Sequence, residues 1–142
     1  MSATTCTARF TGGRAICGGR RGRNKAAHDI ERNGYRIVAE EVTMKVNGSR
    51  IRADFVAIDG HGNYHVFEAK HGNSGLTKNQ GKAGVFDMNS PSNTTSGIGG
   101  GTITLSMGTK GKFEVATGNK DITRDIGARG SSHDAIFHVL SY

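Results

Sequence analysis

Residues 35–70 read YRIVAEEVTMKVNGSRIRADFVAIDGHGNYHVFEAK, and they show the clearest alternation in the chain. In residues 35–46, one parity carries Val38, Val42, Met44 and Val46, and in residues 50–58 one parity carries Ile51, Phe55 and Ala57. A period of two with β-branched residues predicts strands. Asn47-Gly48 between them is typical of a tight hairpin turn, and a third strand is expected over 64–70 after the turn residues Asp-Gly-His-Gly-Asn. Three consecutive strands joined by short turns form a β-meander.

The chain outside this stretch predicts shorter elements. A short helix is expected over 24–32 and another over 77–85, where Thr77 and Gln80 have the spacing of a capping box. Residues 87–101 are typical of a loop. Strands are expected over 102–107 and 113–117, and residues 134–140 fit either a strand or a short helix.

Composition limits the class of protein and the kind of partner. The 142 residues suit about one domain, and the chain has neither an apolar run long enough for a membrane helix nor the pattern of a cleaved signal peptide. Cys6 and Cys17 fit one disulfide or two free thiols and lack the spacing of a zinc motif. The formal net charge of +7 favours a polyanionic partner. We expect a basic Gly/Arg-rich arm or loop over 1–23 and a single domain over 24–142.

An acid and a base share one face of the third predicted strand. Glu68 and Lys70 are two residues apart and therefore point to the same side. A hairpin centred on His61 places Asp54 directly opposite Glu68, because each lies seven residues from the centre. Two carboxylates so close repel one another unless a proton or a cation lies between them, and oxygen ligands suit a hard divalent cation. A two-residue turn would instead put the two acids on opposite faces.

These residues carry a resemblance to a known family. Asp54, a hairpin and then Glu68-x-Lys70, with Leu76-Thr77-Lys78-Asn79-Gln80 behind them, resemble the PD-(D/E)xK (restriction-endonuclease-like) nuclease superfamily. The stretch is similar to the nuclease modules of bacterial polymorphic and contact-dependent toxins, over about residues 22–86. The resemblance implies an α+β fold with a central mixed sheet, its meander flanked by short helices.

The resemblance also implies the roles of individual residues. Asp54, Glu68 and the carbonyl of Ala69 would bind a divalent metal, usually Mg²⁺, with Mn²⁺ or Zn²⁺ as alternatives. Lys70 would assist the attacking water and Gln80 would support the site, unless Gln80 serves only the capping box. A second mechanism, with one of the six histidines as general base in a His-metal nuclease, stays open.

The function expected from these observations is metal-dependent hydrolysis of nucleic acid. Expected contacts to the nucleic-acid backbone come from Arg20, Arg21, Arg23 and Lys78. Aromatic residues make up 6% of the chain and Trp is absent, which favours duplex DNA over stacked single strands, with tRNA or other RNA as the alternative. As a toxin module, the domain would be delivered by a secreted effector, act in the target cytoplasm and have an acidic cognate immunity protein. The competing interpretations are a non-catalytic nucleic-acid-binding domain and a protein-interaction module.

Overall fold

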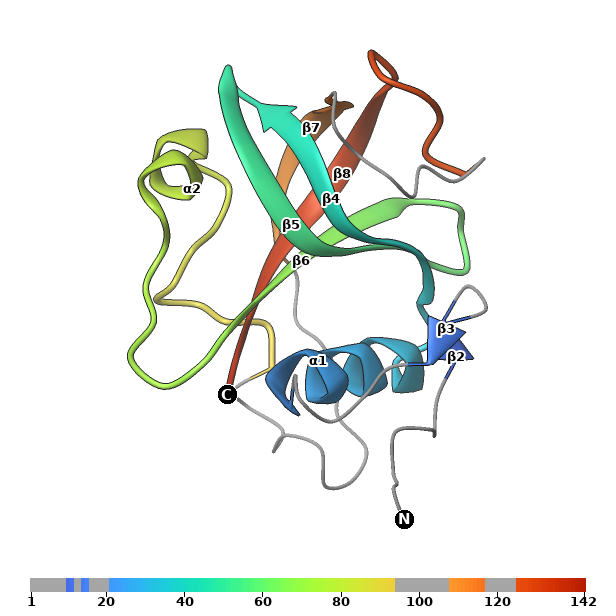
Figure 1. The fold of residues 1–142 in the computed structure, drawn as a ribbon, viewed down its shortest axis with the longest axis vertical. Coiled ribbons are helices and arrows are strands. Elements are labelled where there is room, and N and C mark those ends of the chain that lie inside the picture. The colour runs from blue at the N-terminus through green and yellow to red at the C-terminus, as the bar shows by residue number, and fades with distance from the viewer. Residues whose placement is uncertain (1–9, 12–13, 16–20, 94–107, 117–124) are drawn as a thin grey trace.

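Five strands join edge to edge into a closed barrel in the order β4-β5-β6-β8-β7 (Figure 1). The computed structural model describes residues 10–11, 14–15, 21–93, 108–116 and 125–142. The elements are β2 (Phe10–Thr11), β3 (Arg14–Ala15), α1 (Arg21–Arg32), β4 (Arg36–Val46), β5 (Ser49–Ile58), β6 (Tyr64–Lys70), α2 (Lys78–Ala83), β7 (Thr109–Val115) and β8 (Ser132–Ser141). Neither α1 nor α2 is long and apolar enough to cross a membrane, and these are the helices within the described residues.

The three predicted meander strands are present as β4, β5 and β6, and local turn chemistry sets their register. Asn47 and Gly48 both have positive φ, 50° and 82°, as a tight primed turn between twisted strands requires. At the second turn the Asp59 carboxylate accepts hydrogen bonds from the amides of His61 and Asn63 at 2.8 and 3.0 Å. This turn centres the hairpin on His61, so that Val56 lies opposite Val66.

The remaining strands close the sheet. β8 pairs in parallel with β6 and antiparallel with β7. β7 then returns to β4, where Met44 lies opposite Val115 and Lys45 opposite Glu114. Figure 1 shows β7 and β8 passing behind the β4–β5 hairpin. The barrel therefore has no free edge between these five strands.

The expected restriction-endonuclease-like α+β class is wrong. That fold has an open mixed sheet flanked by helices, whereas here the sheet closes on itself through the β4–β7 pair. The β4–β5 pair makes closure possible because it bends: the register shifts between Ile37 and Ala39, and Glu41 has a positive φ of 51°. Such irregularities increase the twist that a barrel needs.

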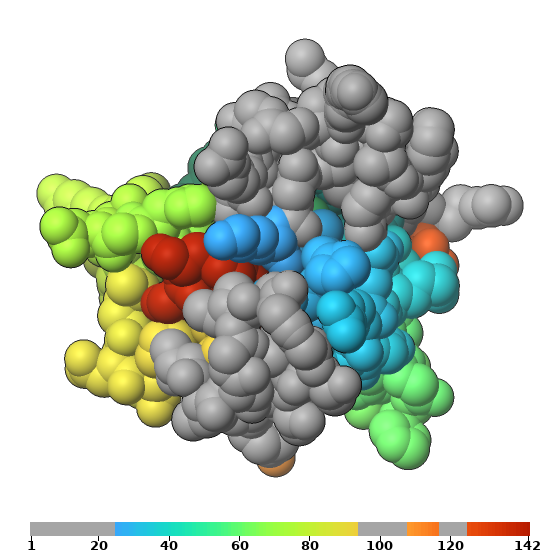
Figure 2. Space-filling view, turned by 90° about the horizontal axis from the view of Figure 1, so that it is seen from below, coloured from blue at the N-terminus to red at the C-terminus, as the bar shows by residue number. Residues whose placement is uncertain are grey.

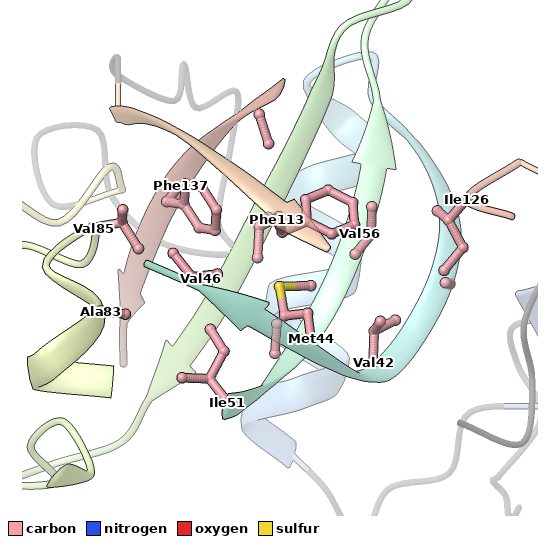
Figure 3. Packing of buried hydrophobic residues seen from close by; sticks show 14 of the residues in the cluster. Val42, Met44, Val46, Ile51, Val56, Ala83, Val85, Phe113, Ile126 and Phe137 are labelled. Atoms are coloured by element: carbon pink, nitrogen blue, oxygen red, sulfur yellow. The ribbon is translucent and has the colours of Figure 1, made fainter. Parts of the chain in front are cut away.

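The barrel interior is packed with aliphatic and aromatic side chains from all five strands. Figure 3 shows Met44 of β4, Ile51 of β5, Phe113 of β7 and Phe137 of β8 pointing towards one another. Ala83 of α2 belongs to the same cluster, so α2 covers part of the barrel wall. Most of these residues are fully buried, which fixes both the register of the strands and the place of α2.

Helix α1 packs on the outside of the barrel. Its Ala26, Ala27 and Ile30 contact a second apolar cluster that includes Phe55 and Phe67. The C-terminal residues, in red in Figure 2, lie between α1 and the yellow residues that follow α2. A hydrogen bond of 2.7 Å from the Tyr142 hydroxyl to the buried Asp29 carboxylate links α1 to the chain end. β6 therefore has apolar packing on both faces.

The other sequence predictions have mixed outcomes. The helix expected over 24–32 begins earlier, at Arg21, and the helix expected from residue 77 ends at Ala83. The ambiguous segment 134–140 is a strand, and β7 begins at Thr109, before the expected 113. The strand expected over 102–107, most of the arm over 1–23 and both cysteines lie outside the described residues.

Candidate functional site

The candidate site lies where β5 and β6 stop pairing. The backbone ladder between them runs from the turn to Phe55 and Phe67. One residue further, the Asp54 carboxylate accepts a hydrogen bond of 2.8 Å from the amide of Ala69. The side chain thus replaces the main-chain partner that β5 would otherwise provide. Because the N–H and C=O of one strand residue point to the same side, the Ala69 carbonyl also faces this gap.

Glu68 projects into the gap from the face of β6 that carries Val66. Its side chain is 8% exposed, and its Oε1 atom is buried without a hydrogen-bond partner. Burial and the nearby Asp54 carboxylate raise the pKa of Glu68 to about 7, against the opposing effects of Lys70 and Gln80. A buried carboxylate with an unsatisfied oxygen is costly to ionise. The site therefore favours a positive charge between the two acids.

Lys70 and Gln80 complete the group. The Lys70 ammonium lies 3.3 Å from Glu68 Oε2 and donates a hydrogen bond of 3.0 Å to Gln80 Oε1. Gln80 Oε1 also accepts from the amide of Thr77 at 3.0 Å, while Thr77 Oγ1 accepts from the Gln80 amide. The predicted capping box is therefore present, and the oxygen that forms it also contacts Lys70, whereas a catalytic role for Gln80 stays a prediction. The start of α2 fixes the direction of Lys70.

The donor set fits a hard divalent cation. Asp54 and Glu68 supply carboxylate oxygens, the Ala69 carbonyl faces the same gap, and Glu68 Oε1 has an unused lone pair. Within the described part of the chain no cluster of three or more His, Cys, Asp or Glu side chains is placed to hold a metal ion. A cation here would therefore take two carboxylates, a peptide oxygen and waters, which is the pattern that Mg²⁺ tolerates.

Of the four residues predicted to contact nucleic acid, the structure describes the side chain of one, Lys78. Arg20 lies outside the described residues, and the structure describes the backbone of Arg21 and Arg23 in α1 without their side chains. Lys78 is exposed at the start of α2 and lines a groove of about 500 Å³. This groove is also lined by Arg50 and Arg52 of β5, which the sequence analysis did not select. The sequence feature that could have identified these two arginines is their position four and two residues before Asp54 on the same predicted strand.

The histidines form a separate structure. Asp59, His65, His138 and Ser92 make one chain of hydrogen bonds of 2.8, 2.9 and 2.7 Å. Burial and the adjacent His65 lower the pKa of His138 to about 3, so this imidazole is neutral. Burial acts to raise the pKa of Asp59, but hydrogen bonds from His65 and from two amides of the turn hold this pKa well below its usual range. Because a carboxylate only accepts, His65 Nε2–H donates to Asp59, while the direction of the other two bonds is set by the tautomers of the two imidazoles.

This chain of hydrogen bonds has a structural role. His138 is 2% exposed and both its ring nitrogens are engaged, which places it inside the protein rather than against a substrate phosphate. The Ser92 amide donates to the carbonyl of Val139, and the Asn93 side chain bonds the backbone of Ser141 on β8. The segment after α2 is therefore fastened along β8. His61 and His71 lie in exposed turns at the two ends of β6.

Comparisons with protein-family models, with curated proteins and with solved structures found no match.

Proposed function

We propose that this protein is a metal-dependent phosphodiesterase that hydrolyses nucleic acid. The observation that carries the proposal is the buried Glu68 carboxylate, which lies near Asp54 and has one oxygen without a hydrogen-bond partner. A purely structural strand would place aliphatic residues there. Two acids and an ammonium in a desolvated gap are better explained by a bound cation and a charged substrate.

The residues divide the chemistry between them. Asp54, Glu68 and the Ala69 carbonyl would hold the cation, whose charge would stabilise the phosphoryl oxygens in the transition state. Lys70 positions the attacking water, and its ammonium offsets negative charge that develops on phosphorus. Gln80 keeps Lys70 in place because the same oxygen caps α2. A lysine that is 10% exposed has few other orientations, so positioning costs little entropy at the moment of reaction.

The biological setting follows from the sequence resemblance. We propose that the domain is a bacterial antagonistic nuclease with an acidic cognate immunity protein. Support comes from the spacing of Asp54, Glu68, Lys70 and Gln80 and from the net charge of +7. DNA is the favoured substrate because few aromatic residues are present for stacking single strands, with tRNA or other RNA as the alternative.

A cleavage assay with matched variants tests the proposal. Wild type, Glu68→Gln and Glu114→Gln are incubated with plasmid DNA and with total RNA, in EDTA or with Mg²⁺, Mn²⁺ or Zn²⁺. Glu114 is exposed on β7, so its variant controls for the loss of one carboxylate. We expect metal-dependent cutting by wild type and by Glu114→Gln, and none by Glu68→Gln.

Two results would contradict the proposal. Wild type that leaves both nucleic acids intact in every metal would support the non-catalytic binding interpretation. Cutting by Glu68→Gln at the rate of wild type would place the chemistry elsewhere in the chain.

A further inference from the structure

We propose that Arg50 and Arg52 bind two successive phosphates of the substrate strand, next to the candidate site that contains Asp54 and Glu68. The substrate is then held by its sugar–phosphate backbone, independently of base sequence. This inference rests on the proposed function and adds the groove beside the candidate metal site.

The first argument is the geometry of β5. Ile51 and Ala53 are 4% and 0% exposed and face the barrel interior, so the alternate residues Arg50 and Arg52 share the other face. Two residues along a strand span about 7 Å, which is close to the spacing of successive phosphates along a nucleic-acid strand. The two guanidinium groups are therefore spaced to contact two neighbouring phosphates.

The second argument is the shape of the groove. Its walls are β5 and the start of α2, and its volume is about 500 Å³. The Asn79 side chain donates to the Arg50 carbonyl at 2.9 Å, and the Asn47 side chain donates to the Ala83 carbonyl at 2.6 Å. These bonds hold both ends of α2 against the β4–β5 hairpin. The groove is therefore preformed and pays little ordering entropy on binding.

The third argument is the chemistry of the lining. Arg50, Arg52 and Lys78 are exposed cations, and guanidinium groups bind phosphate oxygens in a bidentate manner. Glu41 forms an ion pair with Arg52 and so fixes its direction. Among the described residues that line the groove none is aromatic, so it offers no platform for base stacking. The groove recognises charge along a backbone.

The fourth argument is continuity with the candidate site. Gln80 lines the groove and also accepts the hydrogen bond from Lys70. A strand lying along Arg50 and Arg52 would therefore lie beside the side chain that holds Lys70.

Binding measurements on a Glu68→Gln parent test this inference without cleavage. Labelled duplexes of two unrelated sequences, and their single strands, are titrated in EDTA between 50 and 200 mM salt with fluorescence anisotropy as the readout. The groove variant adds Arg50→Gln and Arg52→Gln. The control adds Lys110→Gln and Lys112→Gln, which remove two exposed cations at the same spacing on β7. Because Asn79 bonds the main-chain oxygen of Arg50, the groove variant retains that contact.

We expect the groove variant to lower the salt slope for duplex DNA by about 2 and the affinity at 0.1 M salt by roughly 10- to 100-fold. Both sequences should lose affinity equally, and the β7 control should stay close to the parent. An unchanged slope, an equal loss in the control, or a parent that binds none of the probes would overturn the inference.

The outcome is separable from the cleavage assay. If wild type never cuts but the slope falls as expected, the groove stands as a binding site and the catalytic proposal fails. If wild type cuts and the slope is unchanged, the groove inference fails alone.

Discussion

Replacing Glu68 by Gln should remove a pH-dependent loss of stability in the metal-free protein. The pKa of Glu68 is about 7 in the folded state, against 4.5 for the free side chain, because burial and Asp54 disfavour its charge. The folded state therefore binds this proton more tightly than the unfolded state does. The contribution of Glu68 to stability is fully present below pH 4.5 and is lost as the pH rises through 7.

The expected change in unfolding free energy follows from this difference between the folded and free pKa of Glu68. The rise from 4.5 to about 7 corresponds to about 3 kcal/mol of unfolding free energy between acid and alkaline pH. His138 acts in the opposite direction at lower pH, so the wild-type curve alone mixes two effects. Both proteins contain His138, so the difference in stability between wild type and Glu68→Gln removes the contribution of His138 and leaves that of Glu68.

Urea denaturation in EDTA at pH 4.5, 6 and 8 measures this difference, with Glu114→Gln as the control for charge. We expect Glu68→Gln to gain stability over wild type as the pH rises, and the control to run parallel to wild type. Added Mg²⁺ at pH 8 should stabilise wild type by up to about 3 kcal/mol at 100 times its Kd and leave Glu68→Gln unchanged. A difference that stays constant across this pH range would refute the burial argument, and equal Mg²⁺ stabilisation of both proteins would refute the cation site.

Three further predictions concern the groups around the site and the histidine chain. Gln80→Leu should reduce the rate of cleavage 10- to 100-fold, because Lys70 loses the hydrogen bond that holds it. The kcat of the variant and of wild type measures this; an unchanged kcat would show that Gln80 acts only as part of the helix cap. Ser92→Ala should cost about 1–3 kcal/mol of unfolding free energy in urea denaturation, because His138 Nδ1 loses its hydrogen-bond partner inside the protein; no loss would show that the bond is unimportant. Since the folded pKa of His138 is about 3 and the free value is 6.5, wild type should gain about 5 kcal/mol relative to His138→Asn between pH 3 and 6.5; parallel pH curves would contradict a buried neutral imidazole.

The sequence predicted the local part of the structure well. The β5–β6 hairpin depends on Asp59, His61 and Asn63, which are neighbours in the chain and form the turn among themselves. Its register brings Asp54 to the amide beside Glu68, as the hairpin centred on His61 implies. The Thr77–Gln80 capping box is equally local and is present. Residues 54–80 therefore carry most of the candidate site.

The closed barrel was not predictable by the same means. Closure depends on Met44 pairing opposite Val115, two residues far apart in the chain with no turn motif to relate them. The bend at Glu41 could not be predicted either, because nothing in the sequence indicates that a glutamate will adopt a positive φ. The histidine chain joins His65 to His138 across the parallel β6–β8 pair, which again depends on topology rather than on spacing.

The closed barrel also explains why the site has its electrostatic character. In an open sheet with one solvated face, an acid at the position of Glu68 would be hydrated, and its pair with Lys70 would contribute about 0–1 kcal/mol. Here β8 pairs along the whole of β6, and Val66 beside Glu68 lies inside the barrel core. Closure thus leaves Glu68 buried near the Asp54 carboxylate, at the point where β5 has stopped pairing with β6. The local hairpin selects which residues meet, while the barrel removes the water that would otherwise weaken their charges.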